Sequence, residues 1–162
     1  MIEYIFIDLD GTIINSEEGI TKSVQYALRK MGIDIEDLNS LRKHIGPPLR
    51  DSFMNYYHFD KNKAEEAVKY YREYYEEKGI FQNEVYTGMK EMCERLSAHG
   101  KKLIVATSKP EVFAKKILEY FDLAKYFTNI CGSTMDGSRE RKGAVIQYTL
   151  EKNQITELDK VV

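Results

Sequence analysis

The residues with the clearest chemical signature lie near the start of the chain, at Asp8-Leu9-Asp10-Gly11-Thr12. Two carboxylates at positions i and i+2 after an apolar run point to the same side of an extended chain. Placing two acids there is costly unless a cation or a reaction needs them. Gly11 permits a sharp turn and a close approach of a ligand to the backbone. Thr12 offers a hydroxyl and an N–H to an anion, so the segment predicts a site for a reaction on an anion, a cation or both.

Two other readings of this segment are weaker. Turns favour aspartate, but a turn does not need one acid at the end of an apolar strand and a second acid two residues later. A calcium-binding loop places its glycine at the sixth position between two helices. Here the glycine is the fourth residue and a strand comes first.

Three short stretches are predicted to form the sheet that positions these acids, namely residues 4–9, 102–107 and 128–132. The first two are apolar runs typical of strands buried on both faces. Residues 16–80 instead show apolar side chains at helical spacing, which predicts a helical block inserted after the first strand. Beyond residue 80 strands alternate with helices, and this order predicts an α/β fold with a parallel sheet.

Capping residues and prolines predict where the helices begin and end. The expected signals are Ser16 as the cap of the first helix, a second helix over 38–46, Thr87 as the cap of a helix ending at Gly100, Pro110 near the first position of the next helix, and Lys142 at the start of a helix over 142–152. Val112, Phe113, Ile117 and Phe121 are expected on one buried side of the helix after Pro110.

The chain resembles the haloacid-dehalogenase superfamily. Asp8-Leu9-Asp10-Gly11-Thr12 matches its first motif, Thr107 at the end of the second strand matches the second, and Lys142 matches the third. The helical block matches the small cap of the phosphoglycolate phosphatase-like branch, and so do Ile45-Gly46-Pro47-Pro48-Leu49 and Ser108-Lys109-Pro110. The resemblance implies a discontinuous Rossmann-like core of residues 1–15 and 81–162, with helices on both faces of the sheet, and a cap of residues 16–80.

The resemblance also implies roles for individual residues. Asp8 would be the nucleophile that becomes phosphorylated, and Asp10 the acid and base that serves the leaving alcohol and the attacking water. Mg²⁺ would bind the Asp8 carboxylate, the Asp10 carbonyl and a substrate oxygen, and would offset the repulsion between carboxylate and phosphate. Thr107, Ser108 and Lys142 would hold the phosphoryl oxygens. Arg139 and Arg141 are neighbouring cations, but Lys142 fits the helix start better.

Further candidates come from the expected cap and its surroundings. Gly46 lies in the loop expected to face the substrate as the cap closes over the site, and Arg50 could grip a second anionic group or be an exposed helix arginine. Lys109 could add positive field near the phosphate or be a surface lysine of a first helical turn. The three histidines, at 44, 58 and 99, share no metal-ligand spacing, and we assign them no catalytic role.

One family feature does not appear in the sequence. The fourth motif is an acidic pair just beyond a strand that follows the Lys142 helix, whereas the sequence stops at Val161-Val162, inside that strand. We therefore expect a truncated core that lacks one acidic metal ligand. The strand starting near Val161 is expected beside residues 4–9, and the 162-residue form is expected to be inactive and prone to aggregate.

Composition narrows the class of protein. The net charge of −2 argues against a nucleic-acid partner, and no apolar run approaches the roughly 20 residues that span a bilayer. The two cysteines lack metal-ligand spacing, and reduced thiols with no signal peptide predict a cytoplasmic protein. The oligomeric state is left open.

The sequence thus predicts a Mg²⁺-dependent phosphomonoester hydrolase of small phosphorylated metabolites, similar to phosphoglycolate phosphatase. Phosphoglycolate, a nucleoside monophosphate and pyrophosphate all remain possible substrates. Two alternatives stay open: a non-catalytic protein of this fold that binds Mg²⁺ or a phosphoester, and a sugar phosphomutase with the same nucleophile.

Overall fold

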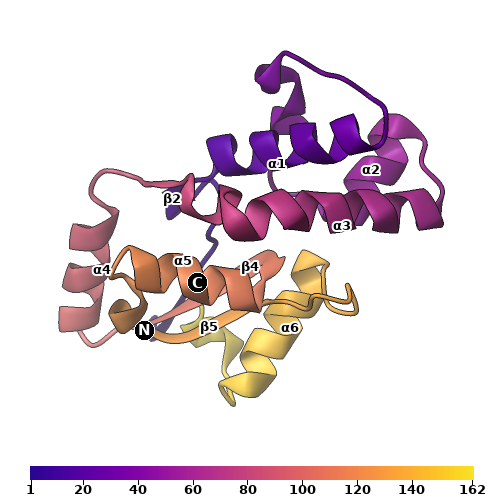
Figure 1. The fold of residues 1–162 in the computed structure, drawn as a ribbon. Helices are drawn as coiled ribbons and strands as arrows, with labels where there is room; N and C mark the ends of the chain where they lie inside the picture. Colours follow the sequence, from indigo (N-terminus) through magenta and orange to yellow (C-terminus); the bar gives the residue numbers. More distant parts are fainter. The chain divides into compact units, whose positions relative to one another are not determined.

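A computed structural model describes all 162 residues and divides the chain into two compact units. The core unit comprises Met1–Ile14 and Val85–Val162, and the helical unit comprises Asn15–Glu84. The chain passes between them through β2 (Ile14–Asn15) and β3 (Glu84–Val85), which pair as a two-stranded sheet. Both units can be followed by colour in Figure 1.

The core unit is built on a parallel sheet of three strands in the order β1-β4-β5. These strands are β1 (Tyr4–Ile7), β4 (Lys102–Pro110) and β5 (Phe127–Ser133). The central strand β4 is buried from Leu103 to Ala106, as its unbroken apolar run predicts for a strand covered on both faces. The register pairs Ile7 with Val105 and Ala106 with Cys131, which brings the carboxyl ends of all three strands to one edge of the sheet.

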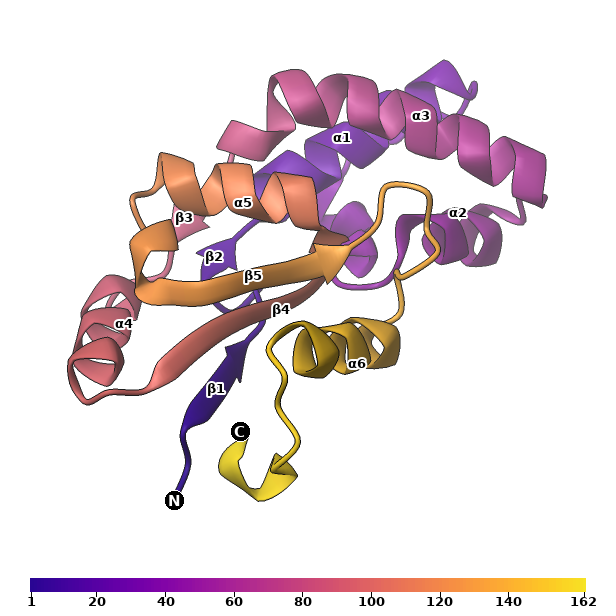
Figure 2. The same cartoon turned by 90° about the horizontal axis from the view of Figure 1, so that it is seen from below.

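Three helices cover this sheet: α4 (Met89–Ala98), α5 (Glu111–Tyr120) and α6 (Lys142–Lys152). Figure 2 shows α5 and α6 on opposite sides of the β4–β5 pair, and both helices contact both strands. Two single-turn 3₁₀ helices complete this unit: η3 (Ala124–Tyr126) lies between α5 and β5, and η4 (Leu158–Lys160) follows α6. The predicted α/β fold, a parallel sheet with helices on both faces, is confirmed.

The last residues of the chain lie beside β1, as expected from the resemblance. Val161 forms a parallel bridge with Tyr4. The backbone N–H of Phe6 donates to the carbonyl of Val162 at 2.7 Å, and the N–H of Val162 donates to the carbonyl of Tyr4 at 3.1 Å. These bonds occupy the edge of β1 that does not face β4.

The helical unit contains α1 (Glu17–Lys30), η1 (Leu38–His44), α2 (Leu49–Tyr57), α3 (Lys61–Glu77) and η2 (Gly79–Phe81). Its core is the apolar face of α1 packed on that of α3, together with Phe53 of α2. Gly19 of α1 and Gly79 lie so close that a Cβ on Gly19 would stand 2.2 Å from the Gly79 carbonyl oxygen. A side chain at Gly19 would therefore push this pair of segments apart.

Several predicted local features differ in the structure. Ser16 occupies the cap position of α1 without a side-chain hydrogen bond, and Asn15 accepts from the N–H of Glu17 instead. The helix expected over 38–46 is the 3₁₀ segment η1, and α4 is preceded by Gly88 at φ 83° rather than capped by Thr87. In α5, Phe113 and Ile117 are buried as expected but Val112 is 43% exposed.

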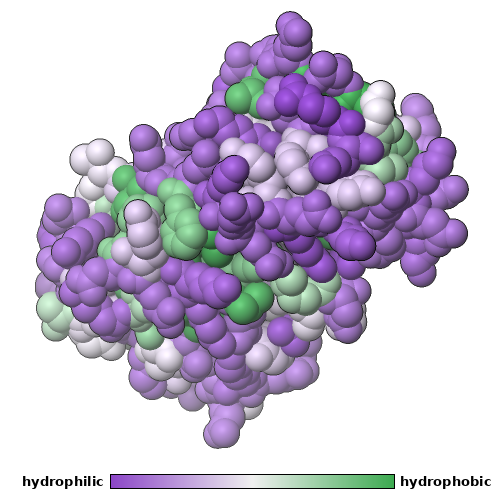
Figure 3. Space-filling view, viewed as in Figure 1, coloured by the Kyte–Doolittle hydropathy of each residue, from purple (hydrophilic) through white to green (hydrophobic).

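No helix of the structure combines the length and the apolar character needed to cross a bilayer. On the face drawn in Figure 3, hydrophobic residues form small groups among hydrophilic ones.

Candidate active site

Asp8 and Asp10 stand where β1 ends, on either side of a completely buried Leu9. The backbone then closes a tight turn, because the carbonyl of Leu9 accepts from the N–H groups of Thr12 and Ile13 at 3.2 and 2.9 Å. Gly11 adopts φ 77°, a conformation that glycine reaches without strain. The turn fixes both acids at the carboxyl edge of the sheet, where α/β folds bind ligands.

Lys142 reaches Asp8 from the first residue of α6. Its Nζ lies 2.7 Å from Oδ2 of Asp8 and donates to the carbonyl oxygen of Ala106 at 2.7 Å. The Asp8 and Lys142 side chains are 42% and 43% exposed, so the pair is open to solvent. The other Asp8 oxygen, Oδ1, accepts from the N–H of Leu9 at 2.8 Å. The ends of β1 and β4 and the start of α6 therefore meet at this carboxylate.

Lys109 reaches the second acid from the end of β4. Its Nζ lies 3.2 Å from Oδ1 of Asp10, and the two side chains are only 5% and 13% exposed. The alternative that Lys109 is a surface lysine of a first helical turn is wrong, because β4 continues to Pro110 and α5 begins at Glu111. A signal for this was present, since a residue before proline is restricted to extended backbone. Extended backbone aligns Lys109 with Thr107, two residues earlier.

Thr107 and Ser108 complete the end of β4. Thr107 is 1% exposed, and its Oγ1 accepts a hydrogen bond from the N–H of Lys109 at 3.1 Å. A hydroxyl that accepts still carries a proton to donate. Ser108 is partly exposed. The two residues come immediately after Ala106 in the chain, and the Ala106 carbonyl accepts the hydrogen bond from Lys142. Their role in binding phosphate stays a prediction.

The donor set at this edge fits a magnesium ion held jointly by protein and substrate. Oδ1 of Asp10 is buried, and besides the Lys109 ion pair it has no hydrogen-bond partner. No group of three or more His, Cys, Asp or Glu side chains is arranged so that it could hold a metal ion by itself. Mg²⁺ is often bound through only one or two carboxylates, with substrate phosphate and water supplying the rest. Asp8 and Asp10 are the residues that could provide that protein share.

The two candidates in the expected cap both lie in the helical unit. Gly46, at φ 103°, follows η1 in the loop that leads to α2. Arg50 in α2 forms an ion pair with Glu65 of α3, and its hydrogen bond lowers the pKa of that carboxyl. The Arg50 side chain is only 16% exposed, so the alternative that it is an exposed helix arginine is wrong. A contact of either residue with substrate stays a prediction.

His44 is the buried histidine of the helical unit, at 1% exposure. Its Nε2 lies 3.2 Å from the Tyr57 hydroxyl, and its ring packs against Phe53 and Tyr56. Burial, reinforced by the charge of Lys43, lowers the pKa of His44 to about 4. The imidazole is therefore neutral at pH 7, in keeping with a packing role.

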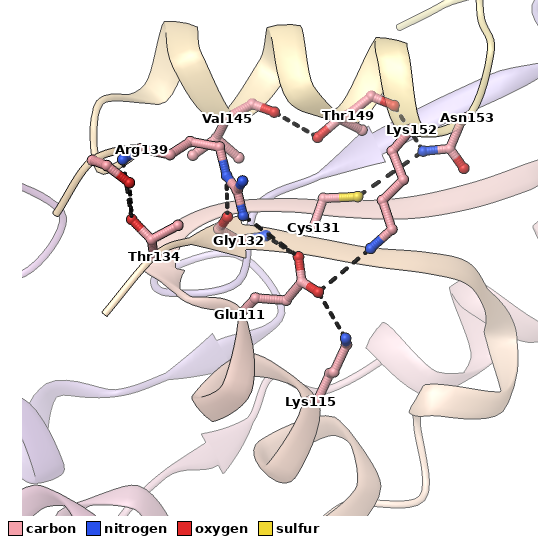
Figure 4. Close-up of polar contacts among 11 residues, drawn as sticks. Glu111, Lys115, Cys131, Gly132, Thr134, Arg139, Val145, Thr149, Lys152 and Asn153 are labelled. Atoms are coloured by element: carbon pink, nitrogen blue, oxygen red, sulfur yellow. Dashed lines mark hydrogen bonds and ion pairs between the residues drawn. The ribbon is translucent and has the colours of Figure 1, made fainter. Parts of the chain in front are cut away.

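Sequence reasoning missed a polar network behind the site, drawn in Figure 4. Its centre is Glu111, the first residue of α5. Oε1 of Glu111 forms ion pairs with Nζ of Lys115 at 2.7 Å and with Nζ of Lys152 at 3.4 Å. Burial alone would raise the pKa of Glu111, but the hydrogen bond from Lys115 and the charge of Lys152 outweigh burial and lower it. Arg139 also belongs to this network and not to the Asp8 site.

Comparison with known proteins identifies a family that the chain matches. A family model described as haloacid dehalogenase-like hydrolase matches residues 4–162. A Pseudomonas aeruginosa protein named 5′-nucleotidase is 46% identical over 147 residues, which are 91% of this chain and 66% of that protein. A solved structure of a predicted phosphatase from Clostridium acetobutylicum is 49% identical with a TM-score of 0.97, and the match covers 100% of this chain and 74% of that one.

Two other relatives carry different names. A Mycobacterium tuberculosis protein named tyrosine-protein kinase PtkA is 32% identical over 91% of this chain and 50% of its own length. An Aquifex aeolicus protein named phosphoglycolate phosphatase is 31% identical over 91% of this chain and 68% of its own length. The chain thus spans between half and about two thirds of these curated relatives.

Proposed function

Because this chain belongs to the haloacid dehalogenase-like hydrolase family, we propose that it hydrolyses small phosphomonoesters through an aspartyl-phosphate formed on Asp8. The observation that carries the proposal is the contact of Lys142 Nζ with Asp8 Oδ2 at 2.7 Å. An amine fixed beside a carboxylate at the carboxyl edge of a parallel sheet is suited to bring a phosphate dianion and an anionic nucleophile together. The relatives named as nucleotidase and phosphatases support the same reaction class.

The reaction proceeds in two displacements. An oxygen of Asp8 attacks phosphorus, the bond from phosphorus to the ester oxygen breaks, and Asp10 gives its proton to the departing alkoxide. Water then attacks phosphorus while Asp10 takes the water proton, and inorganic phosphate leaves as the Asp8 carboxylate is restored. Lys142, Thr107 and Ser108 hold the phosphoryl oxygens. Lys109 holds Asp10 in place through their buried ion pair.

Asp8 and Asp10 would hold a Mg²⁺ ion, which when bound neutralises part of the charge shared by nucleophile and phosphate. The Asp8 carboxylate and the Asp10 backbone carbonyl are oxygen donors of the kind that Mg²⁺ prefers, and this arrangement leaves the Asp10 carboxyl, paired with Lys109, for proton transfer.

The substrate is proposed to be a small phosphorylated metabolite. The relative named 5′-nucleotidase favours a nucleoside monophosphate, and the relative named phosphoglycolate phosphatase favours a phosphorylated hydroxy acid. The helical unit, with Gly46 and Arg50, is proposed to choose between such substrates. We further propose a cytoplasmic location, because Cys93 and Cys131 are buried free thiols.

Phosphate release tests the proposal. The protein and its Asp8→Asn variant are incubated with p-nitrophenyl phosphate, with nucleoside monophosphates and with phosphoglycolate, each with Mg²⁺ and with EDTA. Asp8→Asn should abolish turnover while the far-ultraviolet circular dichroism spectrum stays unchanged, because an amide is not a competent nucleophile. Turnover by the variant at the wild-type kcat would show that the covalent mechanism is wrong.

A second candidate is a protein of this fold that binds a phosphoester without hydrolysing it. The absence of a three-ligand acidic cluster within these 162 residues favours it. Calorimetric binding of inorganic phosphate, with no phosphate released from any substrate in the panel, would identify this case. A sugar phosphomutase would instead isomerise a sugar phosphate without releasing phosphate.

A further inference from the structure

The loop between β5 and α6 leads to Lys142, the first residue of α6. This loop, residues 134–141, is folded on itself, since Thr134 Oγ1 accepts from the N–H of Arg139 at 3.1 Å. Within it, Asp136 Oδ1 accepts from the N–H and the hydroxyl of Ser138 at 2.9 and 2.8 Å. This fold brings Arg139, three residues before Lys142, back beside the start of the loop.

Arg139 connects this loop to two elements, β5 and α6. Its Nε donates to the carbonyl oxygen of Gly132 in β5 at 3.1 Å. Its guanidinium lies 3.5 Å from the ring centroid of Tyr148 in α6, and the side chain is 24% exposed. A planar guanidinium can stack on a ring and donate in its own plane at once, which an ammonium cannot do. Arg139 thus ties the end of β5 to the body of α6.

Glu111 binds the other backbone group of the same residue of β5. The N–H of Gly132 donates to Oε2 of Glu111 at 3.3 Å, and Arg139 Nη2 lies 4.0 Å from that oxygen. Glu111 also receives Lys152 of α6 at 3.4 Å. Figure 4 shows Gly132 between Glu111 and Arg139. One backbone residue of β5 therefore links α5 to the loop that precedes α6.

Gly132 also lets β5 approach the turn from β4 into α5, next to Lys109. A Cβ at this position would lie 2.6 Å from the Lys109 carbonyl oxygen and 2.7 Å from Cα of Glu111. Backbone atoms at such a distance cannot yield without a shift of the turn. Gly132 therefore packs against the backbone next to Lys109 and also binds Arg139, which lies in the loop before Lys142.

We propose that Glu111, Gly132 and Arg139 form a clamp that positions Lys142 against Asp8. The Lys142 side chain is 43% exposed and has four rotatable bonds, so holding it in one conformation carries an entropy cost. With the start of α6 clamped, the amine reaches both Oδ2 of Asp8 and the Ala106 carbonyl. The three residues touch neither reacting atom and act through Lys142. Only the consequence for turnover rests on the proposed function.

The test measures Lys142 directly. Competitive acetylation followed by peptide mass spectrometry compares the reaction rate of Lys142 with that of the exposed Lys116 in the same sample. An amine held in an ion pair and a hydrogen bond acylates slowly. Arg139→Met should raise the relative rate of Lys142 about tenfold, since a charge-assisted hydrogen bond is worth that factor or more. Glu111→Gln, which keeps the shape, should act in the same direction and serves if Arg139→Met does not fold.

Lys115→Met is the matched control. Lys115 lies closer to Glu111 than Lys152 does, but it is on the exposed side of α5, and its side-chain hydrogen bond runs to Glu111 and not to the loop or to Gly132. Its loss should change the relative rate of Lys142 by less than about twofold. An unchanged Lys142 rate in both Arg139→Met and Glu111→Gln would overturn the clamp. An equal rise in Lys115→Met would overturn it too, because general loosening would then explain the effect.

A double-mutant cycle separates positioning from loss of stability. If the clamp acts through Lys142, Arg139→Met should weaken binding of inorganic phosphate in the wild-type background but have almost no effect beside Lys142→Ala. Equal factors in both backgrounds would contradict the proposal. The acetylation assay needs no turnover, so a protein without phosphatase activity would refute the proposed function and still report whether the clamp holds.

Discussion

Lys109 and Asp10 form a buried ion pair, with Nζ 3.2 Å from Oδ1 and side chains only 5% and 13% exposed. The acid that is proposed to move protons is therefore held by a cation from a neighbouring strand. If one member of such a pair is removed, the other charge is left buried without a partner or water. This unpaired charge destabilises the folded protein.

Lys109→Met should accordingly lower the free energy of unfolding by about 3 kcal/mol, measured by urea denaturation. The double variant Lys109→Met/Asp10→Asn should recover much of the loss, because no unpaired charge is left. Lys102→Met, which breaks an exposed pair with Glu3, is the control and should have little effect. A loss no larger than the control's would show that the buried pair is not stabilising.

Asp10→Asn should slow phosphate release by roughly 10²–10⁴-fold, because an amide cannot supply acid and base catalysis. Steady-state kinetics with p-nitrophenyl phosphate measures this. A loss below about threefold would remove Asp10 from the proposed role.

Lys142→Ala should weaken the binding of inorganic phosphate and fluoroberyllate at least about tenfold, since it removes the amine beside Asp8. Titration calorimetry measures both ligands. Arg139→Ala should weaken binding less, because Arg139 acts only through the position of Lys142. The opposite ranking would mean that Arg139, not Lys142, carries the phosphate contact.

Gly132→Ala should destabilise the protein by about 1–3 kcal/mol, because the new Cβ meets the backbone of Lys109 and Glu111 at 2.6–2.7 Å. Gly143→Ala is the contrasting change, since a Cβ on this residue of α6 meets nothing within 4 Å. It should stabilise by roughly 0.5–1 kcal/mol through helix propensity. Thermal and urea unfolding compare the two variants, and a Gly132→Ala protein as stable as the wild type would contradict the close packing.

His44 should make stability depend on pH. Its pKa is about 4 in the folded protein and near 6.5 in the unfolded chain. The unfolded chain therefore binds the proton first, and stability present above pH 6.5 is lost as the pH falls to about 4. The loss amounts to roughly 3 kcal/mol at about 1.4 kcal/mol per unit.

Urea unfolding between pH 4 and 7 checks this dependence. His44→Phe should flatten the curve over that interval, because a ring that cannot take a proton replaces the imidazole. His99→Gln, at an exposed position, is the control. An unchanged slope in His44→Phe would assign the pH dependence to other groups.

The sequence by itself determined the architecture and the position of two candidate acids at the end of a strand. The apolar runs at 4–9 and 102–107 and the alternation of helices and strands predicted a parallel α/β fold. The structure has that fold, because strands buried on both faces must be apolar throughout. The spacing of Asp8 and Asp10 predicted acids at a strand end, and the start of α6 at Lys142 was predicted to the residue. These features depend on short-range order along the chain.

Only the tertiary structure decided which charges meet. The proline after Lys109 favours extended backbone there, but nothing in the local sequence shows that Lys109 meets Asp10 while Lys115 is exposed on the next helix. Arg139 and Lys142 are neighbours with similar charge, yet one stacks on Tyr148 and the other reaches Asp8. Such choices arise because β1, β4 and β5 bring residues far apart in the chain to one edge. The cost of burying a charge then permits only pairings that its neighbours in space can satisfy.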